Sequence, residues 1–291
     1  MLIALGGLLF LLVIGGAVRL LLRRRTEGAK PPLVHVEFWV YTNDKQRPDD
    51  KELMTRLVME NPHRKKGPPV GDKEGLTMND ARFHIGLAKR ERNPYLFRPD
   101  IIADGESADL LEVAALVGET ANAIRVQFVS EVPLKDRAYL QFVTHAADAV
   151  AGLCDAPAVY DVEAAKLTRA DELYDKLEAD NDATRFELQV RTVWEDTPDA
   201  GRAFTRGMAK AGLPDIEMVQ VPLDHKTLAR FLVESAAREC WERGSMEPVE
   251  VEGFGEVFRV EFSERRPGLS SHRGWLSTMH AGRKRPIGEG A

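Results

Sequence analysis

The densest group of side chains that could do chemistry lies between residues 191 and 217, where arginines and carboxylates are interspersed. Six members of this group are the candidate ligand-binding residues: Arg191, Glu195, Asp196, Arg202, Arg206 and Asp215. Paired carboxylates beside arginines can supply a general acid or hold a divalent cation. The same segment can instead form a capped helix, which Thr197 or Asp199 would begin and Gly212 would end. We favour capping and surface pairing, and keep ligand binding or catalysis as the alternative.

The other reactive residue types show no comparable pattern. None of the seven histidines stands in an H-E-x-x-H spacing, and Cys154 and Cys240 lack the paired spacing of a metal or redox motif. Ser270 and Ser271 precede His272 without a G-x-S-x-G motif. We therefore assign no catalytic residue, no metal and no cofactor. Both cysteines are expected to be buried thiols, as in a reducing compartment.

Residues 1–22 form an apolar run that only Arg19 interrupts, and Arg23, Arg24 and Arg25 close it. A helix of roughly 20 residues rises about 30 Å, which matches the hydrocarbon core of a bilayer. The run therefore predicts a transmembrane anchor. We expect these four arginines to contact the membrane where the helix leaves it, with Arg19 extending to the headgroups.

The basic residues also predict how the anchor is oriented. No Lys or Arg precedes the apolar run, whereas the linker at residues 23–32 is basic and contains two prolines. Because positive charge favours the cytoplasmic side, we expect a single-pass protein with its body in the cytoplasm. The alternative is a signal peptide cleaved after Ala17, but such a peptide carries its positive charge ahead of its apolar core.

The charges of the body exclude one class of partner. The chain has 291 residues, 44% of them hydrophobic, and a net charge of −6. Residues 26–263 hold 30 basic and 44 acidic side chains, so the body is much more acidic than the whole chain. An acidic surface repels nucleic-acid phosphates, and we therefore expect no nucleic-acid partner.

Residues 264–291 differ from the body, because they are rich in Gly, Ser and basic residues and include Arg283, Lys284 and Arg285. They predict a basic flexible tail, since chain termini are disordered by default. The alternative is a tail that lies on anionic lipid, which would gain about 1 kcal/mol per basic residue near the surface. Trp275 keeps this alternative open, because tryptophan favours the membrane interface.

The body opens with a strand at Leu33 to Tyr41, rich in β-branched and aromatic residues, and a helix at Asp49 to Glu60 with apolar residues at helical spacing. A long loop with three prolines follows at Asn61 to Gly75. Short strand pieces are expected within Ala81 to Ile102. Exposed helices are expected within Val162 to Ala183.

A strand-helix-strand rhythm appears twice in the rest of the body. The first instance comprises Ile124 to Val129, Asp136 to Leu153, and Ala158 to Tyr160. The second comprises Ile216 to Val221, Lys226 to Arg243, and Val257 to Phe262, after a strand at Phe186 to Trp194. We therefore expect an α+β body at 33–263 with related halves at 33–160 and 184–263. The expected sheets are ferredoxin-like or split β-α-β, with helices on one face.

Two segments carry a family resemblance. The stretch Ala203 to Met218 reads A-F-T-R-G-M-A-K-A-G-L-P-D-I-E-M, and residues 158–167 read A-V-Y-D-V-E-A-A-K-L. Together they resemble uncharacterised bacterial domains of unknown function. The resemblance implies a bacterial α+β protein and transfers no role to any residue.

These observations favour a protein of the bacterial inner membrane whose cytoplasmic body binds a protein or ligand without catalysis. Its expected partners are the lipid bilayer, through residues 1–22, and an unknown protein. The alternative is a membrane-tethered hydrolase or transferase that uses the polar region at residues 191–217. A third hypothesis makes the chain a structural tether whose basic tail binds anionic lipid.

Overall fold

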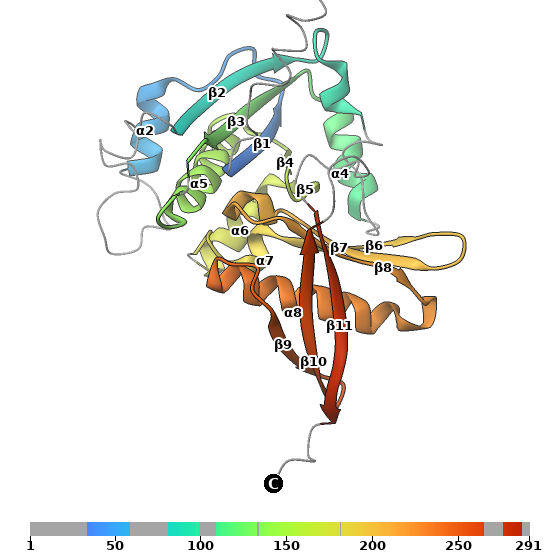
Figure 1. Cartoon of the computed structure of the whole chain (residues 1–291). Coiled ribbons are helices and arrows are strands. Elements are labelled where there is room, and N and C mark those ends of the chain that lie inside the picture. Colours follow the sequence, from blue (N-terminus) through green and yellow to red (C-terminus); the bar gives the residue numbers. More distant parts are fainter. Residues whose placement is uncertain are drawn as a thin grey trace, which may run out of the picture. The chain divides into compact units, whose positions relative to one another are not determined.

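Strand β1 (Val34–Thr42) is the centre of the first of two sheets in the computed structural model (Figure 1). The structure describes residues 34–58, 81–98, 109–132, 134–180, 182–264 and 276–286. Within these ranges, no helix is both long and apolar enough to cross a membrane. The predicted anchor and its four arginines, the linker and the long loop at 61–75 lie outside the described residues.

The first sheet has the order β2-β3-β1-β4-β5, and each neighbouring pair is antiparallel. Its other strands are β2 (Ala81–Lys89), β3 (Asn122–Ser130), β4 (Ala158–Asp161) and β5 (Lys166–Arg169). Strand β3 separates β1 from β2, and β1 separates β3 from β4. Two strand-helix-strand units are therefore interleaved in one sheet.

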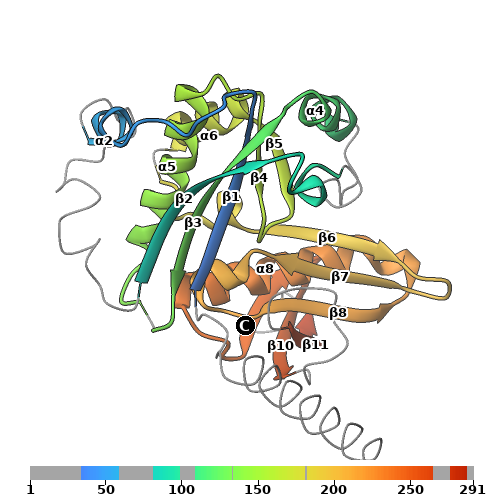
Figure 2. The ribbon, with the colours of Figure 1, turned by 90° about the horizontal axis from the view of Figure 1, so that it is seen from above.

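Helices cover both faces of the first sheet. The side chains of β1 alternate between the two faces, so they belong to two different cores. Val36, Phe38 and Val40 lie in the main core with α5 (Ala138–Leu153), whereas Trp39 and Tyr41 lie in a second core with α4 (Asp109–Gly118). The remaining helical elements of this half are α2 (Asp50–Val58), η1 (Pro94–Phe97) and α6 (Ala170–Asp180). Figure 2 shows α5 and α4 beside the strands of this sheet.

The second sheet has the order β6-β7-β8-β11-β10-β9. Its strands are β6 (Arg191–Asp196), β7 (Gly201–Arg206), β8 (Asp215–Val221), β9 (Val249–Gly253), β10 (Glu256–Glu264) and β11 (Leu276–Pro286). The helical elements of this half are α7 (Phe186–Gln189), η2 (Met208–Ala211), η3 (Leu223–His225) and α8 (Lys226–Arg243). Strands β8 and β11 are parallel, and the other neighbours are antiparallel. The predicted α+β class is thus confirmed. The expectation of helices on one face does not hold for the first sheet, because α5 and α4 cover opposite faces of it. The strand orders of the two sheets differ, and the relation between the halves stays a prediction.

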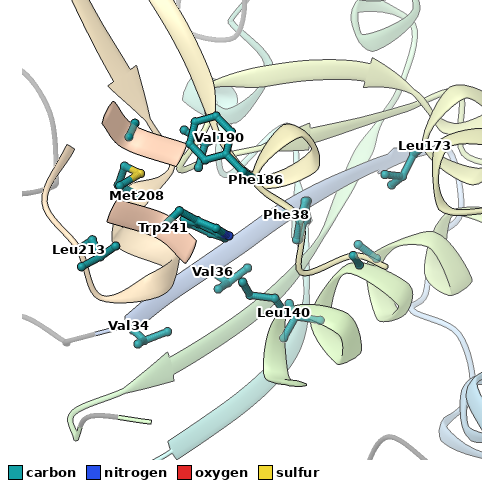
Figure 3. Packing of buried hydrophobic residues seen from close by; sticks show 14 of the residues in the cluster. Val34, Val36, Phe38, Leu140, Leu173, Phe186, Val190, Met208, Leu213 and Trp241 are labelled. Carbon is teal, nitrogen blue, oxygen red and sulfur yellow. The ribbon is translucent and has the colours of Figure 1, made fainter. Parts of the chain in front are cut away.

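One hydrophobic core joins the two sheets. Phe38 of β1 and Leu140 of α5 belong to the same buried cluster as Met208 of η2 and Trp241 of α8 (Figure 3). Phe186 of α7 contacts Trp241 edge to face, at 6.2 Å between ring centroids. The helical turns between the sheets therefore bury apolar side chains from both halves, and the free energy of this burial holds the halves together.

Three predictions about elements are wrong. The strand expected at Phe186 to Trp194 is split, because Phe186–Gln189 form a helical turn and β6 begins only at Arg191. The helix expected between Thr197 and Lys210 is instead the end of a β-hairpin, since β6 pairs with β7 across a turn at residues 197–200. The prediction of a flexible tail is wrong for Leu276–Pro286, because these residues form β11 between β8 and β10.

Candidate functional site

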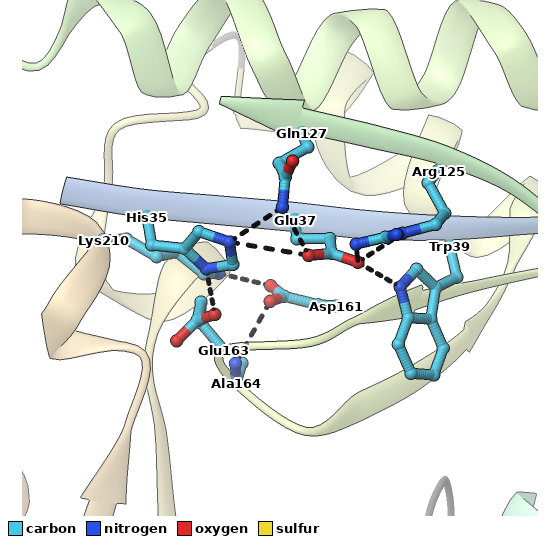
Figure 4. Close-up of polar contacts among 9 residues, drawn as sticks. All are labelled: His35, Glu37, Trp39, Arg125, Gln127, Asp161, Glu163, Ala164 and Lys210. Atoms are coloured by element: carbon cyan, nitrogen blue, oxygen red, sulfur yellow. Dashed lines mark hydrogen bonds and ion pairs between the residues drawn. The ribbon is translucent and has the colours of Figure 1, made fainter. Parts of the chain in front are cut away.

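A network of charged side chains extends from strand β1 into the connection between β4 and β5 (Figure 4). His35 and Glu37 stand two residues apart on β1 and therefore share one face of the sheet. His35 Nδ1 contacts Glu163 Oε1 at 2.5 Å, and its Nε2 lies 3.5 Å from Glu37 Oε2. One imidazole thus links a carboxylate of β1 to a carboxylate of the connection between β4 and β5.

Glu37 is the centre of this network, although only 1% of the residue is exposed. Gln127 Nε2 donates to Glu37 Oε2 at 2.9 Å, and Arg125 Nε donates to Oε1 at 2.8 Å. Trp39 Nε1 also donates to Oε1. Arg125 and Gln127 come from β3, which pairs with β1 in register Glu37 to Gln127. The buried carboxylate is therefore surrounded by donors, as a buried charge requires.

The network fixes the charges of its two titratable centres. Burial alone would lower the pKa of His35, but the hydrogen bonds and charges of Glu163 and Glu37 outweigh it and raise the pKa to about 9. For Glu37 the directions are reversed. Burial alone would raise its pKa, but hydrogen bonds from His35 and Trp39 and the charge of Arg125 outweigh burial and lower the pKa to about 2. Both groups are therefore ionised at neutral pH and poorly matched to proton transfer there.

A second polar group lies on the opposite face of β1 and is fully enclosed. Lys210 of η2 is 0% exposed, and its Nζ donates to Asp161 of β4. The same ammonium donates to the backbone oxygen of Gln189 at 2.9 Å and to its Oε1 at 3.0 Å. It also lies 5.6 Å from the ring centre of Phe38. Lys210 therefore joins the second half of the chain to strands β1 and β4 of the first.

The short connection between β4 and β5 holds both groups in place. Asp161 and Glu163 are two residues apart, one bound to Lys210 and the other to His35. Asp161 Oδ1 also accepts from the backbone N of Ala164, and Ala165 takes a left-handed φ of 48°. This tight turn lets two nearby carboxylates reach opposite faces of the sheet.

The six predicted ligand-binding residues do not form one site. Arg202 donates to the fully buried Glu217 at 2.8 Å and to Glu195 at 3.3 Å. Asp196 accepts from Trp194 near the exposed end of the hairpin. Arg191 and Arg206 lie opposite each other in the strand register, at the other end of the same strand pair. The hairpin therefore places Glu195 and Asp196 at the opposite end of β6 from Arg191.

Asp215 is the most deeply buried of the six predicted residues. Its Oδ1 accepts from Thr205 Oγ1 and from the backbone N of Met208, both at 3.1 Å. Burial raises the pKa of Asp215 to about 7, and the two hydrogen bonds only partly oppose this rise. The residue therefore anchors the start of β8 to η2 and is half protonated near neutral pH.

We expect Asp215→Asn to stabilise the chain at pH 8 by about 1–2 kcal/mol, because an amide accepts the same bonds without ionising in a buried site. The folded pKa of Asp215 lies above its usual 3.8, so its ionisation costs stability progressively from pH 3.8 to about 7. Urea unfolding at pH 5 and pH 8 measures the effect. If the unaltered chain and Asp215→Asn lose the same free energy of unfolding between pH 5 and pH 8, this expectation is wrong.

The packing at the start of β7 requires a glycine at residue 201. A Cβ on this residue would lie 1.8 Å from Cζ2 of Trp194, whose indole covers the glycine. We therefore expect Gly201→Ala to cost about 1–3 kcal/mol of stability, because the indole must move. Gly118→Ala is the matched control, since a Cβ there meets nothing within 4 Å. Equal urea midpoints for the two variants would show that the indole adapts freely.

Sequence reasoning missed the residues of both polar groups. The signal was the alternation in β1, where polar His35 and Glu37 interrupt an otherwise apolar strand that is buried on both faces. Lys210 gave no signal, because an isolated lysine is ordinarily exposed. Both cysteines are buried, as predicted, and burial raises the pKa of Cys154 to about 12 and that of Cys240 to about 11.

No cluster of three or more His, Cys, Asp or Glu side chains suited to a metal ion occurs among the residues that the structure describes. Comparisons of the chain with protein-family models, with curated proteins and with solved structures find no match.

Proposed function

We propose that the body is a non-catalytic binding module held at the cytoplasmic face of the bacterial inner membrane by residues 1–22. The observation that carries the binding role is the fixed charge of the network around Glu37. A pKa of about 9 for His35 and of about 2 for Glu37 keeps both groups ionised through the physiological range. Such groups do not exchange protons readily. Glu37 is itself enclosed, so the partly exposed side chains of His35 and Arg125, 20% and 39% exposed, would present this fixed charge to a partner.

The membrane part of the proposal is supported by the sequence. The apolar run at residues 1–22 has the length of a bilayer span, and the arginines that follow it favour a cytoplasmic body. Through this tether the module would meet its protein partner or ligand near the membrane. The basic side chains of residues 264–291 extend the proposal to contact with anionic lipid.

The alternative, a hydrolase or transferase, takes second place. It would need the carboxylates of the 191–217 region to act together. Glu195 and Asp196 are exposed near the hairpin turn, whereas Asp215 is buried against Thr205 at the start of β8. Because a general acid must lie within reach of the reacting group, this separation favours binding over chemistry.

The test of this proposal combines localisation with activity assays on the full chain. We expect the protein in the membrane fraction after carbonate washing, and no hydrolysis of phosphoester, ester or peptide substrates. Activity that disappears in Glu195→Ala or Asp196→Ala, but persists in the exposed control Glu261→Ala, would overturn the binding role. A fully soluble protein would overturn the tether.

A further inference from the structure

Strand β2 forms one edge of the first sheet and lacks the features that usually protect an edge strand. No strand of the part of the chain that the structure describes pairs with its outer side, and Figure 1 shows it outermost in this sheet. All nine of its residues pair with β3 without a bulge. Residues 83–88 contain no Asp, Glu, Lys, Arg or Pro. Such an edge offers a regular row of backbone donors and acceptors to another strand.

The other edge strands of the two sheets differ from β2. Strand β5 has only four residues, and two of them are basic. Strand β6 begins with Arg191 and ends with Glu195 and Asp196, and β9 carries Glu250 and Glu252 among its five residues. Short length and charged side chains keep sheet edges from pairing with other chains. Of these edges, β2 is therefore the one best suited to a further strand.

The apolar side chains of β2 are incompletely covered. Phe83, Ile85 and Leu87 share one face of the strand, where they pack against the main core and are only partly buried. The ring of Phe83 contacts that of Phe142 in α5, at 4.8 Å between centroids. A strand added beside β2 would continue this face and remove more of the three side chains from water.

We propose that β2 pairs with β2 of a second copy of this chain, antiparallel about Ile85, so that two five-stranded sheets become one. Antiparallel pairing of a strand with itself follows the twofold symmetry of most homodimers. In this register Phe83 of each copy lies opposite Leu87 of the other, and the two Ile85 side chains are neighbours on the axis. The strand thus supplies both sides of a matched apolar pairing.

The charged residues of β2 favour the same register. Arg82 lies opposite Ala88 of the other copy, and Lys89 lies opposite Ala81, so no like charges face each other. Pairing centred one residue later would instead place Arg82 opposite Arg90 of the other copy. Like charges directly opposite each other destabilise a strand pair, so the register about Ile85 is the favoured one.

Single cysteines test this register on the full chain in neutral detergent. Ile85→Cys places two thiols opposite each other, where the distance between paired strands suits a disulfide, so mild oxidation should give a covalent dimer. Phe83→Cys is the matched control on the same face, because its two thiols would be out of register. We expect about tenfold more covalent dimer from Ile85→Cys than from Phe83→Cys. The native Cys154 and Cys240 are buried and should not contribute.

Light scattering of the same protein measures its oligomeric state. We expect a dimeric mass for the unaltered chain and for Ile85→Met, and a monomeric mass for Ile85→Lys, which would bring two ammonium groups together on the axis. A lysine at this partly buried edge position can extend to water in the monomer, so the fold should persist. Should Ile85→Lys fail to fold, the cysteine pair still decides.

Two outcomes would overturn the pairing. A monomeric mass for the unaltered chain would leave the edge of β2 to a strand of another protein. A dimer in which Ile85→Cys and Phe83→Cys cross-link equally would use a different surface. The pairing goes beyond the proposed binding role and is independent of it, because it uses the edge of the sheet and not the network around Glu37.

Discussion

Lys210→Met should lower the free energy of unfolding by about 3–5 kcal/mol, the largest loss that we expect from one substitution. The ammonium of Lys210 is fully enclosed and binds Asp161 together with two oxygens of Gln189. Methionine fills a similar volume but leaves the Asp161 carboxylate with only the backbone N of Ala164 as a donor. An uncompensated buried charge is more costly than the pair itself is stabilising.

A double variant separates this cost from simple loss of packing. Adding Asp161→Asn to Lys210→Met removes the bare charge, so the double variant should unfold at a higher urea concentration than Lys210→Met alone. Arg47→Met is the control, because Arg47 pairs with Asp50 at an exposed position and its loss should have little effect. If Lys210→Met unfolds with the same midpoint as the unaltered chain, Lys210 does not hold the two halves together.

The elements that sequence reasoning located were those with strong local periodicity. The helix expected at Lys226 to Arg243 has those bounds in the structure, and the strand expected at Leu33 to Tyr41 is β1 within one residue. The hairpin of β9 and β10 turns at Phe254 and Gly255, both with positive φ, between strands with alternating valines, a pattern typical of tight hairpins. These patterns are local, so the chain around each residue determines them.

The errors arose where distant parts of the chain decide the structure. Strand β11 has few apolar residues, and it pairs with β10 on one side and with β8 on the other, both distant in sequence or separated by a long connection. Thr197 and Asp199 are typical of helix caps and equally of hairpin turns, and the pairing of β6 with β7 decides between them. Sequence spacing around residue 200 could not show this pairing.

The polar groups were hidden for the same reason. His35 and Glu163 are 128 residues apart, and Lys210 is 49 residues from Asp161. Each residue alone is ordinary, and only the strand order brings them together. The predicted group at 191–217 was close in sequence, but the alternation of β6 and β7 and the length of the hairpin spread its members along the sheet.

Glu37→Gln should cost about 3 kcal/mol of stability at pH 7, since the pKa of Glu37 is lowered from 4.5 to about 2 and each unit corresponds to about 1.4 kcal/mol. The carboxylate accepts from Arg125, Gln127 and Trp39, and an amide cannot accept from all of them. This contribution is complete above pH 4.5 and is lost as the pH falls to about 2. Urea unfolding at pH 7 and pH 3 should therefore show a smaller difference between the two proteins at pH 3.

His35 gives the opposite dependence on pH. Its pKa is raised from 6.5 to about 9, so its contribution is complete below pH 6.5 and is lost as the pH rises to about 9. Glu37→Gln removes one of the two carboxylates that raise this pKa, so the imidazole should titrate at lower pH in the variant. NMR titration of the His35 ring measures this shift directly, with His225 as an internal reference outside the network. An unchanged titration of His35 would mean that Glu163 alone holds its charge and that Glu37 acts only through Arg125, Gln127 and Trp39.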